Sequence, residues 1–253
     1  MKHLLLTLSV FLAALCCDGQ QYSSSAVFAH NDYVREKPFF TAYNLQVGFI
    51  EADVFLSDGE LLVAHHANEI VRSRTLETLY LKPLAIQIHK NKGLIYADAA
   101  KELTLMIDLK TKGTPTLNKL VEQVKGYPDL LACSTLHFLI SGDVPPPSEW
   151  KNYPFFIYFD GRPNIQYSTE ELKRISMIST SFKDHVKWDG PGEIPDEDRK
   201  KITAMMAEVH SKGKQMRLWA TPDTENAWNE LMKLKVDVIV TDDVSKLIAF
   251  LNR

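Results

Sequence analysis

The chain has 253 residues, of which 45% are hydrophobic, enough to bury the core of one domain or at most two. Its 29 lysines and arginines against 32 aspartates and glutamates give a formal net charge of -3. This balance excludes a basic surface for nucleic acid and a polybasic membrane anchor. Any anionic substrate must therefore be held by local groups.

A basic start followed by a short apolar run marks the N-terminus. Lys2 and His3 precede LLLTLSVFLAAL, which has the length of the apolar region of a signal peptide and is too short to span a bilayer. We predict a signal peptide over residues 1–19, cleaved before Gln20. The protein is then expected to be exported, to a periplasm or to the extracellular space.

The three cysteines predict no disulfide framework, because two of them fall within the signal and only Cys133 remains after cleavage. Cys16 and Cys17 leave a lipoprotein open as an alternative. Leu15 speaks against it, since a small residue usually precedes a lipidated cysteine. No integral membrane segment is expected in the mature chain, 20–253.

The rest of the chain alternates between apolar, strand-like runs and helix-like stretches. The eight strand-like runs lie at 25–32, 48–56, 102–110, 135–143, 154–162, 176–183, 214–222 and 236–242. Helix-like stretches, with acids near their starts and Lys or Gly near their ends, lie at 114–131, 168–175, 195–213 and 223–235. Residues 20–253 are thus predicted to form one (β/α)₈ TIM barrel, a fold of typically ~250 residues. A doubly wound sheet is the alternative.

Each predicted strand begins apolar and finishes polar, as a barrel with its active site at the carboxyl ends of the strands requires. In 48–56, alternation puts Glu51 and Asp53 on one face and the apolar residues on the other. In 102–110, alternation puts Asp108 and Lys110 on one face. Three carboxylates suit a hard divalent ion, Mg²⁺ or Ca²⁺, better than zinc. Alternatively, the acids form ion pairs at a barrel rim, and Lys110 neutralises them without a metal.

Three histidines lie near these acids at or just beyond strand ends: His30, His65 and His66. His3 belongs to the predicted signal peptide, and His89, His137 and His210 are expected to have structural or solvated roles. His185 follows the sixth predicted strand and stays possible.

The ordered motifs AHNDY, EADVFLSDGELLVAHH, MIDLK, RLWATPD and VDVIVTDD carry a resemblance to a known family. The chain resembles the glycerophosphodiester phosphodiesterases of the phosphatidylinositol phospholipase C-like superfamily. The resemblance extends in particular to the branch that includes the fungal altered inheritance of mitochondria protein six and secreted bacterial relatives.

The resemblance implies a metal-dependent phosphodiesterase, a phosphoric diester hydrolase of lipid metabolism. His30 and His65 match the general acid and base pair of that family. Glu51 and Asp53 match metal ligands, and Asp108 stands where the family usually has glutamate. The implied cofactor is one divalent cation.

The resemblance also implies substrate-binding residues, and it has two departures. Lys110 matches a lysine that faces phosphate, and Trp219 matches an aromatic residue that forms a substrate wall or only packs. The usual His-Arg-Gly is here His30-Asn31, which removes a phosphate clamp that Asn31, Arg162 or Arg217 could replace.

The usual His-Asp is here His65-His66. Adjacent side chains on a strand face opposite ways, and the motif spacing favours His65 for catalysis, with His66 as a supporting residue. The expected substrate is a small or lipid-derived phosphodiester, a glycerophosphodiester, a lysolipid or a phosphoinositide, bound by a monomer. Two other classes stay open, a noncatalytic secreted barrel that binds a ligand and a barrel enzyme acting on sugars, for which Asp160 and Asp242 are the candidate carboxylates.

Overall fold

The computed structural model describes residues 22–253. The predicted signal peptide, with its cleavage site and both of its cysteines, lies outside the described residues and stays a prediction. Cys133 is a buried free thiol. None of the helices formed by residues 22–253 has the length and apolar character of a transmembrane span.

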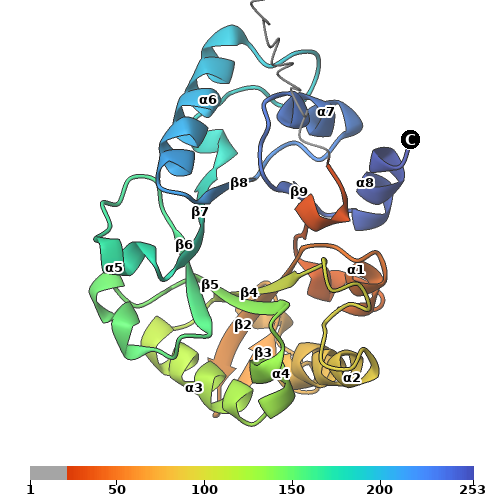
Figure 1. The fold of residues 1–253 in the computed structure, drawn as a ribbon, viewed down its shortest axis with the longest axis vertical. Coiled ribbons are helices and arrows are strands. Elements are labelled where there is room, and N and C mark those ends of the chain that lie inside the picture. Colours follow the sequence, from red (N-terminus) through yellow and green to blue (C-terminus); the bar gives the residue numbers. More distant parts are fainter. Residues whose placement is uncertain (1–21) are drawn as a thin grey trace, which may run out of the picture.

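Eight parallel strands form the wall of a barrel (Figure 1). In chain order they are β1 (Val27–Ala29), β2 (Phe49–Ser57), β4 (Leu103–Leu109), β5 (Leu136–Gly142), β6 (Ile157–Gly161), β7 (Ile175–Ser181), β8 (Gln215–Trp219) and β9 (Ile239–Thr241). They lie side by side in the order β8-β7-β6-β5-β4-β2-β1-β9, and one parallel bridge between Arg217 and Val238 links the two ends. The predicted TIM barrel is confirmed, and all eight predicted strands are present.

A ninth strand, β3 (Glu60–Val63), pairs antiparallel with the outer end of β2 and was not predicted as a strand. The turn between them consists of Asp58 and Gly59, both with positive φ, and Ser57 pairs with Glu60. An Asp-Gly pair is the preferred two-residue loop of a tight hairpin. The hairpin returns the chain towards the barrel, so that His65 follows β3 closely.

Helices cover the outside of the barrel unevenly. They are α1 (Phe40–Asn44), α2 (Lys82–Lys90), α3 (Gly113–Lys125), α4 (Pro128–Ala132), α5 (Thr169–Leu172), α6 (Asp196–Ser211), α7 (Glu225–Lys233) and α8 (Val244–Leu251). The predicted helix 114–131 is divided into α3 and α4, because the residue before Pro128 is disfavoured in the helical region. The predicted helix 168–175 is reduced to the single turn α5, and only a 3₁₀ helix, Pro147–Asn152, separates β5 from β6.

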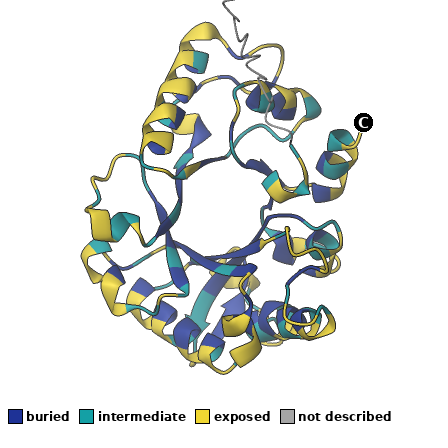
Figure 2. Cartoon of the chain, viewed as in Figure 1, coloured by how far each residue is buried: buried dark blue, intermediate teal, exposed yellow. Residues whose placement is uncertain are grey.

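Side-chain alternation along β2 divides the core into two layers. Ile50, Ala52 and Val54 face outwards and belong to the large apolar layer between strands and helices. Phe49 faces inwards and joins a smaller apolar plug inside the barrel, made of Phe28, Phe49, Met106, Leu139, Met177, Val238 and Val240. Buried strands surround this plug, and exposed residues are confined mainly to the outer helices (Figure 2). The plug forms the floor beneath the inward-facing polar residues that follow along the strands.

Candidate functional site

A cavity of about 270 Å³ opens at the carboxyl ends of the strands. It is lined by every predicted site residue: His30, Asn31, Glu51, Asp53, His65, Asp108, Lys110 and Trp219. Five further residues complete the lining: Ser141, Gly142, Asp160, Arg162 and Arg217. The polar ends of strands far apart in the sequence therefore converge, as a TIM barrel requires.

Three carboxylates meet on the adjacent strands β2 and β4. Asp53 lies opposite Asp108 in the strand register, and Glu51 is two residues before Asp53 on the same inward face. One oxygen from each of the three lies within 4.8 Å of the others. Burial raises the pKa of Glu51 above its usual range, and the charges of Arg217 and His30 only partly offset this. A nearby cation stabilises the charged form of a carboxylate buried in this way.

Lys110 supplies part of that positive charge. Its Nζ lies 2.9 Å from Asp53 Oδ2 and 3.1 Å from Asp108 Oδ1. Burial lowers the pKa of Lys110, but the two carboxylates outweigh this effect and hold its pKa above the ordinary value. Lys110 therefore stays charged and bridges two members of the carboxylate group.

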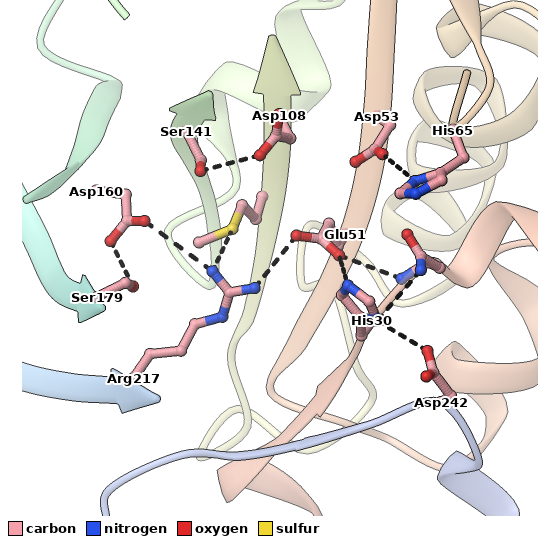
Figure 3. Close-up of polar contacts among 12 residues, drawn as sticks. His30, Glu51, Asp53, His65, Asp108, Ser141, Asp160, Ser179, Arg217 and Asp242 are labelled. Carbon is pink, nitrogen blue, oxygen red and sulfur yellow. Dashed lines mark hydrogen bonds and ion pairs between the residues drawn. The ribbon is translucent and has the colours of Figure 1, made fainter. Parts of the chain in front are cut away.

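Arg217 supplies a second cation from β8 on the far side of the barrel (Figure 3). Its Nη2 donates to Glu51 Oε1 at 3.2 Å, and its Nη1 lies 4.0 Å from Asp160 Oδ2. The guanidinium stacks on the Phe28 ring at 4.0 Å, and the side chain is buried. Arg217 thus bridges the acids of β2 and β6 and spans the cavity floor.

His30 is oriented by Asp242, a residue to which the sequence assigned no such role. Nδ1 of His30 lies 2.8 Å from Asp242 Oδ1, and since a carboxylate only accepts, the imidazole Nδ1–H donates. Burial lowers the pKa of His30, but this hydrogen bond and the charges of Glu51 and Asp242 outweigh it and raise the pKa. The hydrogen bond from His30 also lowers the pKa of Asp242. Nε2 of His30, 3.5 Å from Glu51 Oε2, is then the nitrogen available for chemistry.

His65 is oriented in the same manner on the other side of the carboxylate group. Its Nδ1 donates to Asp53 Oδ2 at 3.1 Å, again leaving Nε2 free of that contact. Asp53 Oδ2 also accepts from the Tyr33 hydroxyl at 2.8 Å. Tyr33 belongs to the AHNDY motif, but nothing in the motif indicated that its hydroxyl reaches β2.

His66 is not among the residues that line the cavity, and its supporting role stays a prediction. Its ring packs edge-on against the ring of His65, with 4.3 Å between centroids. Its main-chain N–H donates to the Glu69 carboxylate in a capping arrangement at the next 3₁₀ turn. Of the two adjacent histidines, only His65 lines the cavity.

Asn31, which follows β1, and Trp219, which ends β8, form two further parts of the wall. Asn31 has a left-handed backbone, φ 48°, and its main-chain N–H donates to Glu51 Oε2 at 3.2 Å. Asn31 therefore orients a carboxylate, while its side-chain oxygen accepts from the Tyr33 hydroxyl at 2.7 Å and its Nδ2 lies 3.2 Å from His30 Nδ1. Trp219 ends β8 with 41% of its surface exposed, which suits contact with a substrate better than core packing.

The donor set fits a hard divalent cation. The hydrogen bonds and ion pairs of the Asp53 carboxylate within residues 22–253 all fall on Oδ2, so Oδ1 remains available as a ligand. The cavity brings together four carboxylates, those of Glu51, Asp53, Asp108 and Asp160, against the permanent cations of Lys110, Arg162 and Arg217. A phosphodiester would add a further negative charge. A divalent ion on oxygen ligands balances this excess, as Mg²⁺ and Ca²⁺ sites do.

Two family models match parts of the chain. The model described as "AIM6-like phosphodiesterase domain" matches residues 20–130, which include β1, β2 and β4. The model described as "Glycerophosphoryl diester phosphodiesterase family" matches residues 215–245, which include β8 and β9. The two matches together contain all eight predicted site residues.

Relatives and solved structures agree with these matches. "Altered inheritance of mitochondria protein 6 homolog" of Arthroderma benhamiae is 26% identical over 87% of this chain and 81% of its own length. The corresponding protein of Eremothecium gossypii is 24% identical over 88% and 69%. A glycerophosphodiester phosphodiesterase structure from Parabacteroides distasonis shares the fold at 17% identity, with a TM-score of 0.56 over 91% of this chain and 98% of that one. The family matches and the relatives together support the glycerophosphodiester phosphodiesterase and phosphatidylinositol phospholipase C-like superfamily, and its AIM6-like branch, for this chain.

Proposed function

We propose that the protein is a metal-dependent phosphodiesterase that cleaves a glycerophosphodiester or a related lipid-derived phosphodiester. The observation that carries the proposal is the placement of two histidines, each held through Nδ1 by a carboxylate, on either side of three converging acids. This arrangement leaves two imidazole Nε2 atoms near a group of ligands suited to a hard cation. It provides general acid and base catalysis beside charge stabilisation.

In the proposed reaction, a hydroxyl of the substrate next to the phosphate attacks phosphorus. One of the two imidazoles, His30 or His65, accepts the proton of that hydroxyl. The bond from phosphorus to the departing alcohol breaks, and the other imidazole protonates the leaving oxygen, so the products are a cyclic phosphate and an alcohol. Water can open the cyclic phosphate in a second step.

Glu51, Asp53 and Asp108 would hold the divalent ion. When bound, it neutralises the nonbridging oxygens of the phosphate. Lys110, which contacts two of the three acids, is placed to give a point charge to the same phosphate. Asn31 keeps Glu51 in position, and Trp219 forms the wall against which the alcohol part of the substrate packs.

A panel of phosphodiester and glycoside substrates, assayed with the purified mature chain and Mg²⁺ or Ca²⁺, tests the proposal. We expect turnover of glycerophosphodiesters and none of glycosides. Turnover of glycosides alone would favour the sugar-active alternative. Absence of turnover across both classes, with binding retained, would favour a noncatalytic binding barrel.

Asp242→Asn is expected to lower turnover roughly 10-fold to 100-fold, the usual cost of losing a partner that orients a functional group. The amide can donate to His30 Nδ1 and thereby favour the tautomer that carries its proton on Nε2. Steady-state kinetics measure the loss, and ¹⁵N NMR of the imidazole should show fewer molecules with the proton on Nδ1. Asp242→Glu, which keeps an acceptor, is the control and should retain the wild-type tautomer; an unchanged tautomer in Asp242→Asn would contradict the orienting role.

A further inference from the structure

The walls of the cavity differ in charge. The three carboxylates Glu51, Asp53 and Asp108 lie on β2 and β4, whereas the opposite wall, from the ends of β6 and β8, contributes one acid, Asp160, together with Arg162, Arg217 and Trp219. Arg217 is buried, stacked on Phe28 and bound to Glu51, so its guanidinium is committed to the protein. Arg162 differs, because its side chain is 36% exposed.

The guanidinium of Arg162 is fixed by one edge only. Its Nη1 donates to Asp160 Oδ2 at 2.7 Å and to the carbonyl oxygen of Gly161 at 2.9 Å. Asp160 is itself buried and accepts from the Ser179 hydroxyl at 2.6 Å, which holds the carboxylate still. The side-chain hydrogen bonds of Arg162 within residues 22–253 all leave from Nη1. Nε and Nη2 therefore remain available as a pair of donors in a preset plane, the geometry that binds a carboxylate or phosphate by two parallel hydrogen bonds.

Arg162 is also set apart from the carboxylate group. A chain of charges runs from Glu51 through Arg217 to Asp160 and then to Arg162, with contacts of 3.2 Å, 4.0 Å and 2.7 Å. Figure 3 shows Arg217 lying between Glu51 and Asp160. An anion bound to the free edge of Arg162 would therefore lie on the wall opposite the acids of β2 and β4, over which the phosphate is held. The two positions call for two anionic groups.

Positive charge continues beyond Trp219 on the same side of the barrel mouth. The residues that follow it, Ala220–Pro222, line a second cavity of about 430 Å³. Lys183 and Lys187 line this second cavity, against the single acid Asp189. The mouth thus has an acidic side suited to a metal ion and a basic side suited to an anion.

We propose that Arg162 is the centre of an anion subsite that binds a second negatively charged group of the substrate, carried by one of the two alcohols of the phosphodiester. This inference rests on the proposed function, since it assigns the substrate class of the same cavity. The favoured substrates are phosphodiesters with an additional carboxylate or phosphate monoester. Diesters with an uncharged end group bind without this contact.

Binding of three glycerophosphodiesters tests the inference. They differ only in the end group of one alcohol, which is a hydroxyl, a carboxylate or a phosphate monoester. Isothermal titration calorimetry in His30→Ala, in the presence of Mg²⁺, measures affinity without turnover. We expect at least one of the two anionic diesters to bind roughly 10-fold to 100-fold more tightly than the hydroxyl diester, as a charge-assisted pair of hydrogen bonds provides.

Adding Arg162→Gln to the His30→Ala protein should remove the preference for the anionic diester. Adding Arg253→Gln, which removes an equal charge at a site paired with Glu225 near the C-terminus, should keep it. Arg162→Lys, which keeps the charge but loses the planar fork, should retain part of the preference and shows whether a loss in Arg162→Gln reflects folding. The anionic diester that binds more tightly, the carboxylate or the phosphate monoester, identifies the anion that the subsite prefers.

Two results would overturn the inference: equal weakening of all three diesters by Arg162→Gln, which would place the arginine on the shared phosphodiester, or no weakening of any. Turnover of the same diesters by the unsubstituted chain separates the two claims. Selective binding of an anionic diester without turnover of any would refute the phosphodiesterase and leave the subsite standing. Turnover without selectivity would refute the subsite alone.

Discussion

His30→Ala is expected to lower phosphodiester turnover by roughly 10²-fold to 10⁴-fold, the usual contribution of a positioned general acid or base. The reason is that Nδ1 of His30 is committed to Asp242, which leaves Nε2 as the nitrogen beside the carboxylate group. The fold should persist, because the ring is partly exposed and belongs to neither apolar layer. Initial rates at saturating substrate and Mg²⁺, with circular dichroism of the same sample, measure both parts.

His65→Ala should give a loss of similar size, since His65 is held by Asp53 in the same manner. His66→Ala is the matched control, because it removes an adjacent imidazole that does not line the cavity, and it should keep turnover within a few-fold of the wild type. Full activity in His30→Ala, or a larger loss in His66→Ala than in His65→Ala, would show that the pair has been wrongly assigned.

Removal of divalent cations is expected to suppress turnover by roughly 100-fold or more, because charge stabilisation by a bound metal lowers the activation free energy by several kcal/mol. Added Mg²⁺ or Ca²⁺ should restore it. The metal-free protein should stay folded, since Lys110 lies within ion-pair distance of Asp53 and Asp108 and offsets part of their charge. Assays after chelation and after re-addition of each ion measure the effect, and whichever ion restores more activity identifies the better cofactor.

Asp108→Asn should raise the concentration of metal needed for half-maximal activity, because it removes one of the three carboxylates while leaving a neutral oxygen ligand. Glu122→Gln is a suitable control, since it removes an exposed acid paired with Lys119 on the outer helix α3. Unchanged turnover in excess chelator would support the alternative in which Lys110 alone neutralises the acids.

The sequence predicted the barrel because each of its strands combines an apolar body with a polar end. Period-two alternation in 48–56 and 102–110 was enough to place Glu51, Asp53 and Asp108 on inward faces, and the register of β2 and β4 brings them together. The short strand β3 was missed because only three apolar residues follow Glu60 in it. So short a segment after an Asp-Gly turn resembles a loop that returns to the barrel.

The partners of the site residues were harder to predict than the residues themselves. Asp242 and Tyr33 bind His30 and Asp53 across 212 and 20 residues of sequence, and alternation within one strand carries no information about such distances. From the sequence, Arg217 could be named only as a replacement for the missing phosphate clamp. Its bridge between Glu51 and Asp160 depends on closure of the barrel. Tertiary pairing, and not local pattern, decides these contacts.

Anomalous diffraction from crystals grown with Mn²⁺ tests the central claim most directly, that the three acids of β2 and β4 form a metal site. We expect a single strong peak bounded by oxygens of Glu51, Asp53 and Asp108, with Lys110 Nζ displaced from at least one of its two carboxylates. Absence of a peak at saturating Mn²⁺, with Lys110 still bridging Asp53 and Asp108, would contradict the claim.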